Sequence, residues 1–201
     1  FTGTVKQIGQ GVNSKWLGKA VTAEINNTCI AYNRKPFCSA CKNGLSSHCL
    51  ERTVTGIIQH SGAFAEEIAV AAGTLHEIPH SVGPLTATLV EPLAAALQTF
   101  IMSPITREET IVVLGPGRLG ILIVFIAALK GLKVLAVSRS EAKRDRALDY
   151  GAIWTCSPDK AEVLIRKNTE GLGADIVVDT TGNPDGITQA LKLVRPRGTV
   201  C

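Results

Sequence analysis

The sequence predicts an α/β fold with a doubly wound parallel sheet in the second half of the chain. An apolar run ends directly in the pattern Gly115-x-Gly117-x-x-Gly120, and an apolar helical stretch follows it. From residue 109 onward, short apolar segments alternate with segments of helical spacing. Such alternation is typical of a parallel sheet with helices on both faces. Together these observations predict a Rossmann-type nucleotide-binding fold.

The expected elements follow in chain order. An apolar stretch of helical spacing at 86–100 is expected to cross between two domains, and residues 1–80 are expected to form short strands broken by Gly, Asn and Pro. Strands are predicted at 111–114, 134–137, 153–156, 175–179 and 199–201. Helices are predicted at 118–130, 141–150, 159–168 and 185–194.

The three glycines of the pattern have separate physical roles. Gly115 allows a tight turn, Gly117 lets backbone N–H groups approach phosphates, and Gly120 lets the helix lie close to the strand. A pyrophosphate would then sit at a helix N-terminus, where unpaired N–H groups favour negative charge. The alternative is a purely structural glycine turn. The predicted cofactor contacts in this segment are Gly115, Gly117, Arg118, Leu119 and Gly120.

The residues after the second predicted strand favour NADP over NAD. A carboxylate at this position would bind the ribose 2′-hydroxyl of NAD, whereas this chain has Ser138 and Arg139, with Lys143 one turn into the next helix. Serine can donate to a 2′-phosphate, and the two cations can pair with it. Alternatively, Ser138 only caps the helix and Arg139 is solvated. Thr180 and Thr181 follow the strand at 175–179, at the edge where such sheets bind ligands, and are further candidates for cofactor contact.

Four of the six cysteines lie within 21 residues, at Cys29, Cys38, Cys41 and Cys49. Four thiolates around one ion form a structural zinc site that leaves no position for substrate. Disulfides and free thiols are the alternatives, although the absence of a visible signal peptide and the nucleotide-binding half favour a reducing compartment over disulfides. Cys29 is the uncertain member because eight residues separate it from Cys38, and His48 is a possible substitute.

Composition narrows the range of partners. The chain has 201 residues, 45% of them hydrophobic, and a formal net charge of +4 without a block of like charges. This balance predicts neither nucleic-acid binding nor a membrane surface, and no apolar run approaches the length of a membrane span. With Met102 as its only methionine and an end inside a predicted strand, the chain is expected to be an internal fragment of a longer protein.

These features occur in an order that resembles the zinc-dependent medium-chain alcohol dehydrogenase family. The resemblance implies that 1–85 form part of a GroES-like β-rich catalytic domain with a zinc lobe at 29–49. It also implies that 86–201 form an NAD(P)-binding Rossmann domain, truncated at its C-terminal end. The segments that carry it are Phe1–Gly9, Trp16–Val21, Cys29–Cys49, Gly62–Glu66, Glu91–Leu97, Gly115–Gly120 and Asp179–Asn183.

The resemblance further implies an oxidoreductase that transfers a hydride between NAD(P) and an alcohol, polyol or sugar-like substrate, with zinc as Lewis acid. Glu91 would be the site residue, as a zinc ligand directly or through water; the alternative is that it only complements the helix dipole. A cytoplasmic homo-oligomer is expected. The alternative hypotheses for the function are a zinc-free NADPH-dependent reductase of the same fold and a non-catalytic NADP-binding redox sensor or scaffold.

Two departures from the family pattern stand out. Cys29 and Cys38 enclose six extra residues, and Lys35 stands where an ungapped alignment would have a thiolate. The family's catalytic Cys and its His-Glu pair would lie before Phe1, so this segment alone is expected to be inactive.

Overall fold

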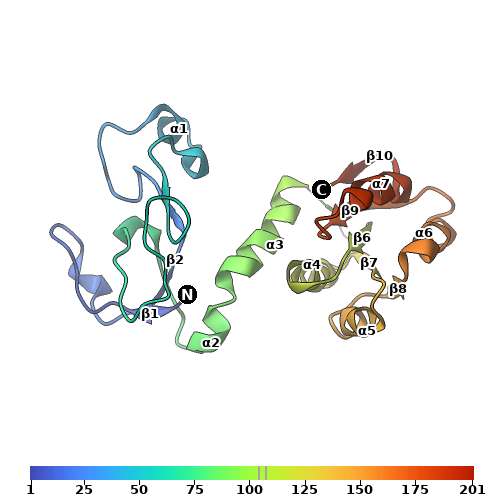
Figure 1. Ribbon diagram of the computed structural model, residues 1–201, viewed down its shortest axis with the longest axis horizontal. Coiled ribbons are helices and arrows are strands. Elements are labelled where there is room, and N and C mark those ends of the chain that lie inside the picture. The colour runs from blue at the N-terminus through green and yellow to red at the C-terminus, as the bar shows by residue number, and fades with distance from the viewer. Residues whose placement is uncertain (104, 107) are drawn as a thin grey trace. The chain divides into compact units, whose positions relative to one another are not determined.

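The computed structural model describes residues 1–103, 105–106 and 108–201, which divide into two compact units, Phe1–Glu91 and Pro92–Cys201 (Figure 1). The first unit consists of short strands and the cysteine lobe, and the second contains a five-stranded parallel sheet with helices. The α/β fold class is therefore confirmed. The domain boundary between residues 85 and 86 stays a prediction.

The first unit is built from short antiparallel strands. One sheet has the order β1-β2-β5, with the bounds Gly3–Thr4, Ala20–Ala23 and Leu75–Glu77. A separate pair joins β3 (Asn26–Asn27) to β4 (Thr53–Val54). Before residue 80, the remaining regular segments are the helix α1 and three 3₁₀ turns, at Ser39–Lys42, Ser14–Trp16, Ser46–His48 and Ala72–Thr74.

The predicted helical stretch at 86–100 is two helices, α2 (Pro84–Ala87) and α3 (Val90–Met102). The N–H groups of Thr88 and Leu89 donate to carbonyls three residues back, which tightens the end of α2. The Thr88 hydroxyl also donates to the Leu85 carbonyl at 2.6 Å and thereby competes with the helical ladder. Apolar spacing continues across this break, so periodicity alone does not reveal it.

The sheet of the second unit has the order β10-β9-β6-β7-β8, and every pair in it is parallel. The predicted elements are all present, and the largest difference is the last strand, which begins at Val194 instead of residue 199. The strands β6 to β10 are Thr110–Leu114, Lys133–Val137, Trp154–Cys156, Ala174–Asp179 and Val194–Val200. The helices α4 to α7 are Arg118–Leu129, Glu141–Asp149, Ala161–Asn168 and Pro184–Leu193.

Both faces of this sheet are buried, which explains the continuous apolar runs of its strands. Along β6, Ile111 and Val113 pack with residues of α3, α4 and α5, whereas Val112 and Leu114 pack with residues of α6 and α7. Figure 1 shows these helices on the two sides of the strands. Each such side chain stabilises the fold by about 1.5–3 kcal/mol, and the carboxyl ends of the strands are thereby held in one fixed row.

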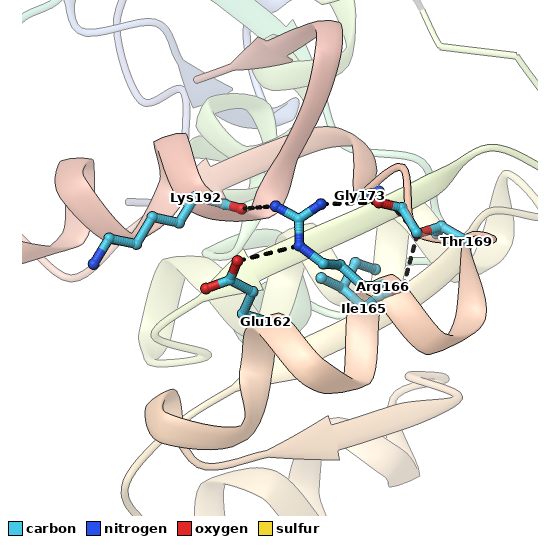
Figure 2. A network of polar contacts seen from close by, with 7 residues as sticks. Glu162, Ile165, Arg166, Thr169, Gly173 and Lys192 are labelled. Carbon is cyan, nitrogen blue, oxygen red and sulfur yellow. Dashed lines mark hydrogen bonds and ion pairs between the residues drawn. The ribbon is translucent and has the colours of Figure 1, made fainter.

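A polar network fastens α6 to the segments around it (Figure 2). The Arg166 guanidinium donates to Glu162 Oε1 at 3.1 Å, to the Gly171 carbonyl at 2.8 Å and to the Lys192 carbonyl at 3.3 Å. The last two contacts join α6 to the loop before β9 and to the end of α7. Arg166 therefore fixes α6, the loop before β9 and the end of α7 to one another.

Replacing Arg166 by methionine is expected to lower the free energy of unfolding by about 1–2 kcal/mol, because two carbonyls lose a charged donor. The matched variant Glu162→Gln removes only the ion pair, whose side chains are 43% and 49% exposed. It should cost less than about 0.5 kcal/mol. Urea unfolding of the two variants checks this expectation, and equal losses would contradict it.

Within the described residues, no helix is both long enough and apolar enough to cross a membrane.

Candidate functional site

The glycine turn lies between β6 and α4. Gly115 has φ +79°, a left-handed conformation that favours glycine, and its N–H donates to the Val137 carbonyl at 3.0 Å. A Cβ on Gly120 would lie 2.5 Å from the Gly115 carbonyl oxygen, so only glycine lets α4 approach this closely. A Cβ on Gly117 would meet only the Gly115 oxygen, at 3.8 Å. The space beside Gly117 is therefore open to a ligand, while the Gly117 N–H itself donates to the Gly115 carbonyl at 2.6 Å.

Two threonines at the end of β9 complete the turn. The Thr180 hydroxyl donates to the carbonyls of Leu114 and Gly115, at 3.0 and 2.6 Å. The Thr181 hydroxyl and N–H both donate to Asp179 Oδ1, at 2.7 and 2.9 Å. The Thr180 bonds hold the end of β9 against the glycine turn, whereas the Thr181 bonds engage the Asp179 carboxylate within its own loop.

The end of β7 presents a hydroxyl and two cations. Ser138 is buried and its Oγ accepts from the Ser140 N–H at 3.2 Å, so the hydroxyl hydrogen remains available to a ligand. Arg139 and Lys143 are exposed. Ser140 precedes the first residue of α5, and its side chain makes no capping bond. A hydroxyl donor beside two cationic side chains is suited to binding a phosphate monoester.

One pocket of about 380 Å³ brings most of the predicted cofactor residues together. It lies at the carboxyl ends of β6, β7 and β9, the edge at which open α/β sheets bind ligands. Of the predicted residues, it is lined by Gly115, Gly117, Ser138, Arg139, Lys143, Thr180 and Thr181. Arg118, Leu119 and Gly120 do not line it; they form the first turn of α4, and Gly120 is buried against Gly115.

Sequence reasoning missed two residues of this pocket that matter for its shape, Pro158 and Gln189. The Gln189 amide donates to the Pro158 carbonyl at 2.9 Å and so joins α7 to the segment after β8. Pro158 follows the carboxyl end of β8, a position that the strand-end rule could have indicated. Gln189 is within α7, where no sequence signal marks it. Both residues also line a neighbouring pocket of about 450 Å³ with an acidic rim that includes Asp159 and Glu162.

The four predicted ligands of the cysteine lobe lie together, with their sulfur atoms all within 4.8 Å of one another. Sγ of Cys38 is 3.8 Å from Sγ of Cys29 and from Sγ of Cys49. Four sulfurs placed tetrahedrally about one zinc ion at 2.3 Å would be about 3.8 Å apart, so the residues fit that ion. These separations are too long for disulfides, and all six cysteines, each within the described residues, are free thiols.

Cys29 joins the cluster in spite of the long segment that follows it. That segment folds back, because the Arg34 N–H donates to the Cys29 carbonyl at 2.8 Å and the Gly73 N–H donates to the Ala31 carbonyl at 3.2 Å. His48 is exposed and its Nδ1 lies 3.1 Å from Ser47 Oγ, outside the cluster. Lys35 is exposed as well.

The thiols of the lobe perturb one another. Backbone N–H groups of Cys41 and Leu50 lower the pKa of Cys38 to about 6, since they stabilise its thiolate. Burial and the neighbouring thiols raise the pKa of Cys41 to about 12. These pKa shifts favour the thiolate at Cys38 and the neutral thiol at Cys41.

Glu91 lies in the first turn of α3 and is exposed. It is the last residue of the first unit, and it is not among the residues that line the cofactor pocket. A carboxylate in a first turn complements the helix dipole, and this is the alternative role for Glu91. Its role in metal binding stays a prediction.

Two family models match the chain. The model for the alcohol dehydrogenase GroES-like domain matches residues 1–80, and the model for zinc-binding dehydrogenase matches residues 119–201. An L-threonine 3-dehydrogenase from Pyrococcus horikoshii is 31% identical over 201 residues, which are 98% of this chain and 56% of that protein. A sorbitol dehydrogenase from Halalkalibacterium halodurans is 28% identical, and the match covers 57% of it.

Solved structures agree with these matches. A protein from Sinorhizobium meliloti, assigned as a zinc-binding dehydrogenase and solved bound to NADP, is 30% identical with a TM-score of 0.87; the match covers all of this chain and 58% of that one. The alcohol dehydrogenase TADH from Thermus sp. ATN1 is 25% identical with a TM-score of 0.88, over 59% of its chain. The chain thus spans somewhat over half the length of the proteins it matches.

Proposed function

The chain belongs to the zinc-dependent medium-chain alcohol dehydrogenase-like family, and from this premise we propose that its protein transfers a hydride between NADP and an alcohol, polyol or sugar-like substrate. One observation carries the choice of cofactor. The pocket that contains the glycine turn is also lined by Ser138, Arg139 and Lys143, where NAD-binding folds have a carboxylate.

The residues of the second unit would hold the dinucleotide as follows. The N-terminus of α4 and the open space beside Gly117 receive the pyrophosphate. Ser138 donates its hydroxyl hydrogen to the 2′-phosphate, and Arg139 and Lys143 pair with its charge. Thr180 fixes the end of β9 to the turn. When bound, NADP would supply the hydride chemistry, and zinc would supply a Lewis acid for the substrate oxygen.

We propose two roles for metal in this protein. Cys29, Cys38, Cys41 and Cys49 hold a structural zinc ion, which the sulfur separations support. Glu91 binds a catalytic zinc ion, either as a direct oxygen ligand or through a water molecule. The Glu91 side chain is exposed in the first turn of α3, so its carboxylate can rotate toward a metal ion.

The remaining proposals concern the setting of the protein. Residues 1–85 belong to the GroES-like domain and residues 86–201 to the nucleotide-binding domain. The free thiols fit a reducing compartment, which supports a location in the cytoplasm. The substrates of the protein are small molecules. By resemblance to its family it forms a homo-oligomer.

Cofactor preference tests this function directly. The full-length protein should bind NADPH more tightly than NADH, and Arg139→Asp should reduce that ratio about 100-fold, because a carboxylate repels the 2′-phosphate and accepts from a 2′-hydroxyl. Arg146→Asp, an equal charge change on the exposed side of α5, is the control and should leave the ratio nearly unchanged. Calorimetric titration with both cofactors measures the effect.

Turnover separates the competing functions. Reduction of NADP by polyols that stops when zinc is chelated supports the proposal. Carbonyl reduction by NADPH that survives chelation identifies a zinc-free reductase. Cofactor binding without turnover of any alcohol or carbonyl identifies a sensor or scaffold and overturns the proposal.

A further inference from the structure

Arg144 lies beside the cofactor pocket but does not line it. It is in α5, directly after Lys143, and it is partly buried. Its Nη1 donates to the carbonyl oxygen of Ser138 at 2.8 Å and to that of Arg139 at 3.2 Å. One guanidinium nitrogen thus binds both carbonyls of the residues that would recognise a 2′-phosphate.

These two bonds complete the constraints on the turn between β7 and α5. The Ser138 N–H donates to the Cys156 carbonyl at 3.0 Å, which ends the ladder with β8. The Ser140 N–H donates to Ser138 Oγ at 3.2 Å. Arg144 then ties the carbonyl side of the same residues to α5. A turn held at both its N–H and its carbonyl groups presents Ser138 Oγ and the Arg139 side chain from a fixed backbone.

The contact also has an electrostatic consequence. Carbonyl oxygens carry partial negative charge and would repel a phosphate dianion placed beside them. Arg144 offsets the partial charge of the Ser138 and Arg139 carbonyls with a full positive charge. Among residues 1–103, 105–106 and 108–201, no carboxylate forms an ion pair with Arg144.

We infer that Arg144 is a positioning residue for recognition of the 2′-phosphate, acting through the backbone of Ser138 and Arg139 and not by contact with the cofactor. The inference rests on the proposed function, because it assumes NADP as the ligand. It assigns cofactor selectivity partly to a residue outside the pocket.

The test compares Arg144→Met with Arg146→Met in the full-length protein, titrated with NADPH and with NADH. Arg146 is exposed on the same helix and, in the described part of the chain, makes no side-chain hydrogen bond, so it is a matched loss of charge. Arg144→Met should weaken NADPH binding about ten-fold, equivalent to ~1.4 kcal/mol, and NADH binding less than about three-fold. Arg146→Met should change neither by more than about two-fold.

Each other outcome has a definite meaning. Equal losses of NADPH affinity in the two variants would show a general charge effect and overturn the inference, as would no loss in either. An equal loss of NADPH and NADH affinity in Arg144→Met would show general damage to the fold and overturn it too; circular dichroism and the melting temperature report that damage independently. A wild-type protein that prefers NADH would overturn the assignment of NADP itself, and the inference with it.

Discussion

Replacing Cys41 by serine is expected to remove about one zinc ion per chain and to unfold the lobe at 29–49. The buried residues of that lobe are Cys29, Cys41 and Cys49, with Phe37 and Cys38 packed against them. Sulfur atoms thus take the place of a hydrophobic core. A segment of this kind depends on its metal for stability, because the energy of metal binding is its folding energy.

The matched control is Cys201→Ser, which removes an exposed thiol outside the cluster. Elemental mass spectrometry of the purified full-length variants counts the zinc, and limited proteolysis reports the order of the lobe. Cys41→Ser should lose metal and gain cleavage within 29–49, whereas Cys201→Ser should match the wild type. Unchanged zinc content in Cys41→Ser would exclude the lobe as the metal site.

Replacing Gly120 by alanine is expected to lower the free energy of unfolding by about 2–3 kcal/mol and to abolish measurable cofactor binding. The new Cβ would lie 2.5 Å from the Gly115 carbonyl oxygen and 2.7 Å from Thr180 Oγ1. Neither atom can yield easily, since one is backbone and the other is bound to that same carbonyl. The turn itself would have to move.

Gly117→Ala separates binding from folding. Its Cβ would meet only the Gly115 oxygen, at 3.8 Å, and its φ of −85° is not in the left-handed region. Stability should stay within about 0.5 kcal/mol of the wild type, while NADPH affinity should fall at least about ten-fold because the methyl group occupies the phosphate approach. Urea unfolding and calorimetric titration measure the two quantities. If Gly120→Ala were as stable as Gly117→Ala, the packing role of Gly120 would be wrong.

The parallel sheet was predictable because both signals used for it are local. The apolar runs and the glycine turn mark β6, α4 and β7 to within one residue. The last strand was predicted too short, since Pro196 and the positive φ of Arg197 interrupt its register with β9 between Val194 and Thr199. A sequence pattern does not show whether such an interruption ends a strand or only bends it.

The candidate site was predictable only where residues follow strand ends. Ser138 and Thr180 follow β7 and β9 directly, and the strand-end rule brings them together. Gln189 reaches the site from α7 through tertiary packing, which spacing along the chain does not encode. Arg144 bonds carbonyls only six and five residues before it, but no sequence pattern marks this contact. The placement of Cys29 likewise depends on how the loop after it folds back.

The bond from Thr180 to the Gly115 carbonyl joins residues 65 positions apart, so it can form only late in synthesis. The central strand β6 pairs with β7 about 23 residues later and with β9 about 65 residues later, and loop closure over the longer distance comes later and more slowly. The glycine turn is therefore translated early but completed only when residue 180 has left the ribosome. Until then its carbonyl lacks this partner and one edge of β6 is open, so a nascent chain stopped before β9 should be a preferred substrate for chaperones.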